Sequence, residues 1–511
     1  MIAYRREIDG LRALAVLPVI LFHAGVEVLR GGFVGVDVFF VISGYLITSI
    51  ILSEQEAGVF RLSQFWERRA RRILPTLFLV IGASIPAAFF LLDQFELHTY
   101  SKSVVAASLF FSNFHFWKDG GYFETAAELK PLLHTWSLAV EEQYYIFFPL
   151  LILLAWRFGK RGMLLLLSLL ATGSFGLCLW ASRASPDAAF FLLPMRLWEL
   201  AIGAFIALYC FRNEVKKDLG LFGELLAIAG LSLVLGAVLT YSSAIPFPGV
   251  YALVPTLGAA LLILFATPST LVGGFLASRV MVGIGLVSYS AYLWHQPVFA
   301  FLRHVHEALS PAAILLGAGL VFCLSFLSWK YVELPCRNRL SLPRARFLKL
   351  IGALGVSVIV VGLSGAKLFS AKAKTGAELA LATELVGRGA VYASNMDERW
   401  FVKSRIAVEE MTPDTLVLGS SRIMQVGEGV LGGKPLNLAV SGAGLEDGIA
   451  LLGLAFAKFE PKTVLLGADP WLFNAAASKK RWRSIADDYQ PDWLPSGMGG
   501  PCPRLNKTWM R

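Results

Sequence analysis

Apolar residues gather along this chain into long runs that short polar loops separate. A helix needs ~20 mostly apolar residues to cross a hydrocarbon layer of ~30 Å. Eleven segments of the chain come close to that length: residues 9–29, 33–53, 73–92, 139–157, 163–182, 190–211, 220–241, 250–267, 280–302, 312–332 and 347–365. The pattern predicts an all-α polytopic membrane bundle of about 11 transmembrane helices.

Basic residues are concentrated in every second loop between these segments, with dense groups at 68–72 and 337–349. Because cytoplasmic loops are enriched in Arg and Lys, the N-terminus is predicted to be cytoplasmic. Eleven spans then leave the chain after residue 365 on the outer face. We therefore expect a multi-pass membrane protein with an extracytoplasmic C-terminal extension. In a bacterium such a protein would span the inner (plasma) membrane, and in a Gram-negative cell the extension would be periplasmic.

The composition supports a membrane protein, since 56% of the residues are hydrophobic and only 16% are charged. A net charge of +10 would suggest a nucleic-acid partner for a soluble protein. Here the basic residues lie in loops, where they act as topology signals, so no nucleic-acid partner is expected. The five cysteines suggest no disulfide in the extension, and no metal site is predicted.

The chain changes character after residue 365, where charged and turn-forming residues become more frequent. Strand-like runs at 415–419 and 463–467 are each followed by a helix-like stretch, which is a β-α-β-α pattern. We therefore predict two domains. Residues 1–365 form the transmembrane domain, and residues 366–511 form a linker and an α/β extramembrane domain.

The first segment carries two ionisable residues, Arg12 and His23. A spacing of eleven residues corresponds to ~3 helical turns and ~16 Å, so both lie on one helix face. One explanation for both residues is purely structural. The Arg12 side chain would reach the inner membrane interface, and His23 would form hydrogen bonds inside the bundle. Ionisable groups within a membrane usually face a cavity, however, and a neutral His23 could act as a general base on a hydroxyl. His295 is also expected at mid-span depth.

Two carboxylates complete the candidate catalytic set. Asp37 follows three glycines that would allow close helix packing, and it could pair with His23 or Arg12 across the first two segments. Glu142 belongs to an acidic pair at the start of the fourth segment. Such an acid could complement the helix dipole, but it could also transfer protons from a buried position.

The run before the third segment contains Arg68, Arg69, Arg71 and Arg72. One explanation is that these arginines anchor the topology, by keeping this end of the helix on the cytoplasmic side of the membrane. Alternatively, Arg69 and Arg72, or Arg68 and Arg71, are spaced three residues apart on one helix face and could bind phosphate groups. The phosphates of coenzyme A would suit such a site.

Taken together, residues 1–340 resemble the acyltransferase-3 family. The resemblance is carried by the Arg12 to His23 spacing, the runs 32–45 and 68–75, the run 136–142 and the run 292–297. It implies that an acyl group, typically acetyl, passes from cytoplasmic acetyl-CoA to a cell-envelope glycan hydroxyl such as that of lipopolysaccharide O-antigen. By resemblance, Arg12 and His23 have the central role in acyl transfer, and Arg69 and Arg72 bind the donor phosphates; Asp37 and Glu142 complete the candidate catalytic residues. Membrane lipid is an expected partner, and no cofactor is expected to be tightly bound.

The extension resembles the first part of an SGNH-type hydrolase domain, with Ser421 at the position of the catalytic serine and Gly442 as an oxyanion-hole residue. The last histidine of the chain is His306, so a Ser-His-Asp mechanism is impossible within the extension. The extension is also short for such a domain, and we expect it to be incomplete or degenerate. For the whole chain, the alternative function is a transporter or flippase that moves an acyl or glycan substrate without chemistry. The hydropathy pattern contains no inverted repeat that would support this alternative.

Overall fold

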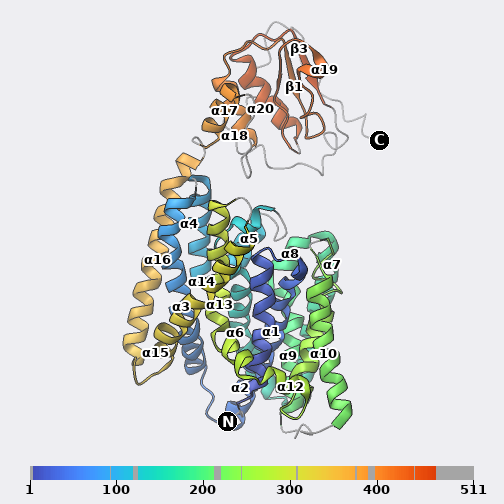
Figure 1. Ribbon diagram of the computed structural model, residues 1–511, viewed down its shortest axis with the longest axis vertical. Helices are drawn as coiled ribbons and strands as arrows, with labels where there is room; N and C mark the ends of the chain where they lie inside the picture. Colours follow the sequence, from blue (N-terminus) through green and yellow to red (C-terminus); the bar gives the residue numbers. More distant parts are fainter. Residues whose placement is uncertain are drawn as a thin grey trace. The chain divides into compact units, whose positions relative to one another are not determined.

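The computed structural model describes residues 4–92, 94–118, 125–211, 220–242, 244–306, 309–373, 377–388, 398–441 and 443–467. The chain divides into two compact units, one built from residues 1–92 and 96–367 and the other from residues 93–95 and 368–511 (Figure 1). The first unit is helical, and the second contains a small parallel sheet.

The helical unit contains long helices with short connecting helices between them. The α-helices are α1 (Arg6–His23), α2 (Gly35–Glu56), α3 (Leu62–Leu91), α4 (Gln94–Ser108), α5 (Ser112–Lys118), α6 (Thr135–Trp156), α7 (Gly159–Ala184), α8 (Pro186–Phe191), α9 (Leu193–Cys210), α10 (Gly220–Thr240), α11 (Leu253–Phe265), α12 (Leu271–Leu276), α13 (Arg279–Val305), α14 (Pro311–Ser328), α15 (Leu334–Arg337) and α16 (Arg344–Ala373). Single turns of 3-10 helix lie at Glu27–Leu29, Gly32–Val34 and Thr125–Leu129, and a π-helical turn at Trp329–Glu333 joins α14 to α15.

The prediction of eleven spans is not confirmed. Among the described residues, eight helical segments are both long and apolar enough to cross a membrane: Gly32–Glu56, Leu62–Leu91, Thr135–Trp156, Gly159–Ala184, Pro186–Cys210, Gly220–Thr240, Pro311–Arg337 and Arg344–Phe369. Helix α11 has only 13 residues, and α1 and α13 carry polar and ionisable side chains that lower their hydropathy. The chain is a multi-pass membrane protein.

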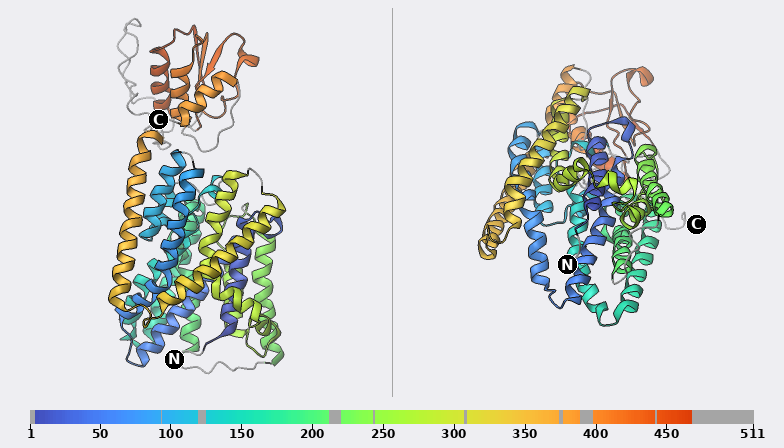
Figure 2. Two further views of the ribbon diagram at one scale, coloured as in Figure 1. Left: turned by 60° about the vertical axis from the view of Figure 1, so that its left-hand side comes forward. Right: turned by 60° about the horizontal axis from the view of Figure 1, so that its bottom comes forward.

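Glycines bring α1 close to its neighbours, as the sequence predicts for the start of α2. A Cβ atom on Gly35 would lie 2.2 Å from the carbonyl oxygen of Ala15, and one on Gly285 in α13 would lie 1.9 Å from that of Asp9. Only a residue without a side chain permits such contacts. As a result, α1 packs tightly against α2 and α13, and these helices run side by side in both views of Figure 2.

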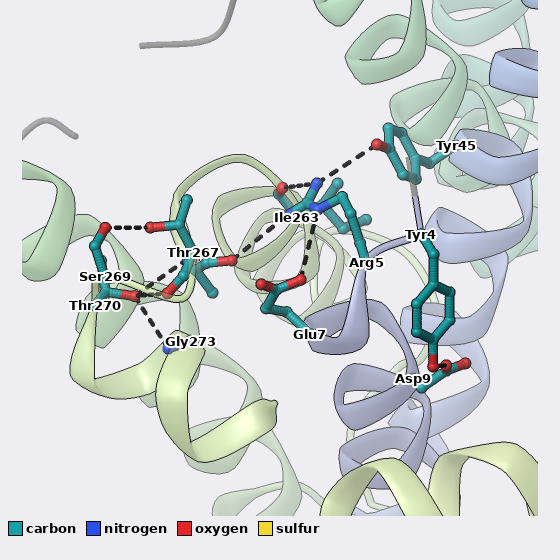
Figure 3. Close-up of polar contacts among 11 residues, drawn as sticks. Tyr4, Arg5, Glu7, Asp9, Tyr45, Ile263, Thr267, Ser269, Thr270 and Gly273 are labelled. Carbon is teal, nitrogen blue, oxygen red and sulfur yellow. Dashed lines mark hydrogen bonds and ion pairs between the residues drawn. The ribbon is translucent and has the colours of Figure 1, made fainter. Parts of the chain in front are cut away.

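The N-terminal end of α1 is anchored to the end of α11 (Figure 3). The Arg5 guanidinium donates hydrogen bonds to the carbonyl oxygens of Ile263, at 2.8 Å, and Ala266, at 3.4 Å. These carbonyls lack partners within α11, and a cation stabilises the negative end of the helix dipole. Arg5 also lies 3.8 Å from a Glu7 oxygen. These contacts fix the position of α1 along its axis, and therefore the position of Arg12 within the bundle.

The second unit is an α/β structure. Its helices are α17 (Ala377–Arg388), α18 (Glu398–Val408), α19 (Glu428–Leu431) and α20 (Leu445–Phe456), and its strands are β1 (Thr415–Leu418), β2 (Pro435–Asn437) and β3 (Thr463–Leu466). The strands form a parallel sheet in the order β2-β1-β3. The two predicted strands are confirmed as β1 and β3. Three strands do not establish an SGNH fold, and that part of the prediction is not confirmed.

Candidate active site

A cavity with an empty volume of about 790 Å³ lies inside the helical unit. Its walls come from α1, α2, α3, α6 and α13. The polar residues that line it are Arg12, Ser43, Arg69, Arg72, Ser137, Glu141, Tyr145, Ser288, Tyr289 and Tyr292. On α6, residues 137, 141 and 145 recur every four positions, so they form one helix face.

The structure separates the four arginines of α3 into two pairs. Arg68 donates two hydrogen bonds of 2.8 Å to the Glu54 carboxylate, and buried Arg71 binds Glu67 at 2.8 Å. Arg69 and Arg72 instead line the cavity. Among the described residues, no carboxylate forms an ion pair with either of them. Arg68 therefore ties α3 to α2, and Arg71 also donates to the Cys336 carbonyl oxygen of α15 at 2.9 Å, while Arg69 and Arg72 offer positive charge to the cavity.

Arg12 lines the same cavity from α1. Its guanidinium lies 3.4 Å from an Asp9 carboxylate oxygen. The Tyr4 hydroxyl donates a 2.6 Å hydrogen bond to the other Asp9 oxygen, as Figure 3 shows. Asp9 thus orients Arg12 from one turn below. The three arginines of the cavity come from two helices, α1 and α3, that are far apart in the sequence.

The acidic pair of α6 is split between two environments. Glu141 lines the cavity and accepts hydrogen bonds from the hydroxyls of Ser43, at 2.9 Å, and Tyr145, at 3.0 Å. Glu142 is also buried but does not line this cavity. Neighbouring residues of an α-helix point ~100° apart, so only one of the two can face the cavity. The catalytic role expected for Glu142 remains a prediction, and Glu141 is the residue that the cavity contains.

His23 belongs to a group of three buried histidines, which we call the histidine cluster: His23, His134 and His295. The ring of His295 lies 5.1 Å from that of His23 and 5.3 Å from that of His134, measured between centroids. His23 ends α1, His134 directly precedes α6, and His295 is central in α13. Sequence reasoning singled out His23 and noted His295, but it did not predict that His134 would join them.

Tyr292 connects the histidine cluster to the cavity. Its side chain lines the cavity, and its ring lies 5.2 Å from that of His295 and 5.5 Å from that of His134. The Tyr292 hydroxyl donates to the His134 carbonyl oxygen at 3.0 Å and lies 2.5 Å from the Ser137 hydroxyl. The Ser137 hydroxyl also lies 3.3 Å from the same carbonyl oxygen, so either hydroxyl can be the donor in the bond between Tyr292 and Ser137. Tyr292 therefore stands between the cavity, which Arg12 lines, and the histidine cluster, whose members are not among the residues that line it.

Asp37 has a different partner from the two that the sequence suggests. Its carboxylate lies 2.9 Å from the Arg196 guanidinium of α9, and Glu199 lies 3.2 Å from the same guanidinium. All three side chains are almost completely buried. Aromatic rings surround Arg196, including Phe40, which also lines the cavity. The expected pairing with His23 or Arg12 is wrong because α9 supplies a closer cation, and a catalytic role of Asp37 remains a prediction.

In the second unit, Ser421 lies in an exposed turn directly after β1. The Asn437 side-chain amide donates to three carbonyl oxygens of the following loop, including that of Ile423 at 2.8 Å. Asn437 therefore fixes the shape of the loop that carries Ser421. Gly442, the expected oxyanion-hole residue, lies outside the described residues.

Comparison with known proteins agrees with the resemblance seen in the sequence. The family model described as an acyltransferase domain, that of the acyltransferase-3 family, matches residues 5–330. O-acetyltransferase OatA of Staphylococcus aureus (strain NCTC 8325 / PS 47) is 30% identical over 351 residues, which are 66% of this chain and 58% of the relative. A putative O-acetyltransferase of Staphylococcus aureus (strain MSSA476) is 32% identical over 352 residues, which are again 66% of this chain and 58% of the relative.

The matched region of this chain therefore spans less than two thirds of the length of these relatives. No solved protein structure matches the chain. The family match nevertheless contains every residue of the cavity and of the histidine cluster. The chain belongs to the acyltransferase-3 family.

Proposed function

We propose that this protein is a membrane O-acyltransferase that moves an acetyl group from acetyl-CoA to a hydroxyl of a cell-envelope glycan. The observation that carries the proposal is an arginine-lined cavity with a cluster of buried histidines beside it, which we call the arginine end and the histidine end of the proposed site. Arg69 and Arg72 face the cavity without a carboxylate partner among the described residues, and the buried histidine cluster lies beyond Tyr292.

The arginine end suits the phosphate groups of the donor. A guanidinium that is not neutralised by a protein carboxylate can form charge-assisted hydrogen bonds with phosphate oxygens. The charged residues that line the cavity are mostly positive: they are the carboxylate Glu141 and the guanidinium groups of Arg12, Arg69 and Arg72. The cavity therefore favours an anionic ligand. The positive charge of the N-terminal half of α3 supports a cytoplasmic location for this end, so that the donor enters from the cytoplasm.

The histidine end suits activation of a hydroxyl. In the proposed reaction, His23 removes the proton from the glycan hydroxyl while the hydroxyl oxygen attacks the thioester carbon. The new carbon–oxygen bond forms as the carbon–sulfur bond breaks, and the proton finally passes to the departing thiolate. The reaction yields an O-acetyl ester and free coenzyme A, and it needs no further reactant. The names of the two relatives, both O-acetyltransferases, support acetyl as the acyl group.

Two measurements test this function. Membrane vesicles that contain the protein should transfer radiolabelled acetyl from acetyl-CoA to an isolated glycan such as lipopolysaccharide O-antigen, and vesicles without it should not. Cells that lack the gene should also lose glycan O-acetyl esters. Transport of the intact donor or of the glycan across the vesicle membrane, without release of coenzyme A, would contradict the proposal and support a transporter or flippase.

A further inference from the structure

The hydrogen bonds of His295 determine which of its ring nitrogens carries the proton. Nδ1 of His295 lies 2.5 Å from the carbonyl oxygen of Tyr292. A carbonyl oxygen can only accept a hydrogen bond, so Nδ1 must be the donor. In the neutral ring, Nε2 is then unprotonated and has a lone pair available.

The environment of this Nε2 atom is unusual for a buried polar group. His295 is completely buried, and among the described residues no protein group forms a hydrogen bond with its Nε2 atom. Buried polar atoms generally have partners, and an exception calls for an explanation. Within the described residues no group of three or more His, Cys, Asp or Glu side chains is arranged to hold a metal ion.

The neighbours of His295 indicate its role. The ring of His23 lies 5.1 Å away, and that of His134 lies 5.3 Å away. His23 is the residue assigned to the glycan hydroxyl in the proposed function. A proton taken up by His23 therefore has a second imidazole beside it, with a lone pair fixed by the Tyr292 carbonyl.

We propose that His295 is a proton-relay residue that accepts, through Nε2, the proton that His23 removes from the glycan hydroxyl. This inference rests on the proposed function. His23 becomes neutral again when the proton moves, and Nδ1 of the resulting His295 cation keeps its hydrogen bond to Tyr292. The proton returns through His23 to the departing thiolate, so the relay consumes no additional reactant. His295 does not contact the substrate in this scheme and acts through His23.

The substitution His295→Asn separates this role from a structural one. The Asn side-chain nitrogen occupies nearly the place of Nδ1 and can donate the same hydrogen bond to Tyr292, but the amide cannot accept a proton at neutral pH. His304→Asn is a matched control, because His304 is on the same helix and its Nε2 atom lies 3.1 Å from the Leu129 carbonyl oxygen, outside the cluster.

Acetyl transfer is measured with full-length protein in membranes, and kcat is calculated per site that binds coenzyme A, so that only folded protein is counted. His295→Asn should lower kcat by about 100-fold, the usual scale of proton-transfer catalysis, while KM for acetyl-CoA changes less than about threefold. His304→Asn should retain wild-type kcat. Added imidazole should restore part of the activity of His295→Ala.

A kcat for His295→Asn within about threefold of wild type, in protein that binds coenzyme A, would overturn the relay while leaving the proposed function intact. If His295→Asn does not bind coenzyme A, the relay is tested with His295→Ala instead. Failure of added imidazole to restore acetyl transfer by His295→Ala would overturn the relay. A wild-type protein that transfers no acetyl group would instead overturn the proposed function, and the relay with it.

Discussion

Arg196 of α9 and Asp37 of α2 form an ion pair of 2.9 Å in which both side chains are almost completely excluded from solvent. Glu199, 3.2 Å from Arg196, adds a second carboxylate to the same cation. Since the two acids depend on one arginine, Arg196→Leu should destabilise the protein more than Asp37→Asn. Removing one partner of a buried pair typically costs about 3–5 kcal/mol, so Arg196→Leu should strongly lower the thermal unfolding temperature in detergent.

The Asp37→Asn variant also tests whether Asp37 is catalytic. If Asp37 only holds α2 against α9, the activity of Asp37→Asn should fall in proportion to the amount of folded protein. An Asp37→Asn variant with wild-type thermal stability and donor binding but no acetyl transfer would contradict this structural role. It would support the catalytic role expected from the sequence.

Replacing Arg69 and Arg72 together with Gln should weaken donor binding. Each charge-assisted hydrogen bond contributes about 1.5–3 kcal/mol, so the loss of two should raise KM for acetyl-CoA at least about 100-fold. Arg68→Gln is the control, since Arg68 is bound to Glu54 and should leave KM nearly unchanged. Equal KM values for the double variant and the control, in correctly inserted protein, would contradict donor binding. Arg69 and Arg72 would then serve only to orient α3 in the membrane.

The spacing of the α3 arginines could not identify the donor pair, because Arg68 with Arg71 and Arg69 with Arg72 are both three residues apart. The choice depends on Glu54 of α2, a tertiary partner of Arg68, and on Glu67, which binds Arg71 within α3. The long apolar runs, in contrast, identified most of the long helices, since helices satisfy their own backbone hydrogen bonds in lipid.

The same reasoning about ionisable residues in apolar segments could have singled out Arg196 and Glu199 within the run 190–211. A single sequence could not show that their partner is Asp37, which is 159 residues from Arg196 along the chain. Nor could it predict the histidine cluster. That arrangement depends on how α1, α6 and α13 pack.

Glu141 and Glu142 should respond differently to neutralisation. Glu141 lines the cavity and repels an anionic donor, whereas Glu142 does not line it. A unit charge within a partly buried site is worth roughly 1 kcal/mol or more, so Glu141→Gln should lower KM for acetyl-CoA about fivefold. Glu142→Gln should change KM less than Glu141→Gln does, because Glu142 interacts with the charge of Arg69 from outside the cavity. The reverse order of effects, measured in the same membranes, would show that Glu142 faces the donor.

Ser421→Ala should leave acetyl transfer by this chain largely unchanged. A serine hydroxyl needs a neighbouring base to become an effective nucleophile, and every histidine of the chain lies at or before His306. The test is acetyl transfer by the full chain, together with a serine-directed fluorophosphonate probe. Labelling of wild-type protein that disappears in Ser421→Ala would contradict the expectation and show that a base reaches Ser421.

The central claim is that acyl transfer takes place in the helical unit with His23 as the base, and His23→Ala tests it most directly. The variant should insert in the membrane and bind coenzyme A like the wild type, because the arginine end of the site is unchanged. Removing a general base typically costs about 10²–10⁴ in rate, so acetyl transfer from radiolabelled acetyl-CoA to the glycan should fall by that factor. Transfer at the wild-type rate by His23→Ala would contradict the account.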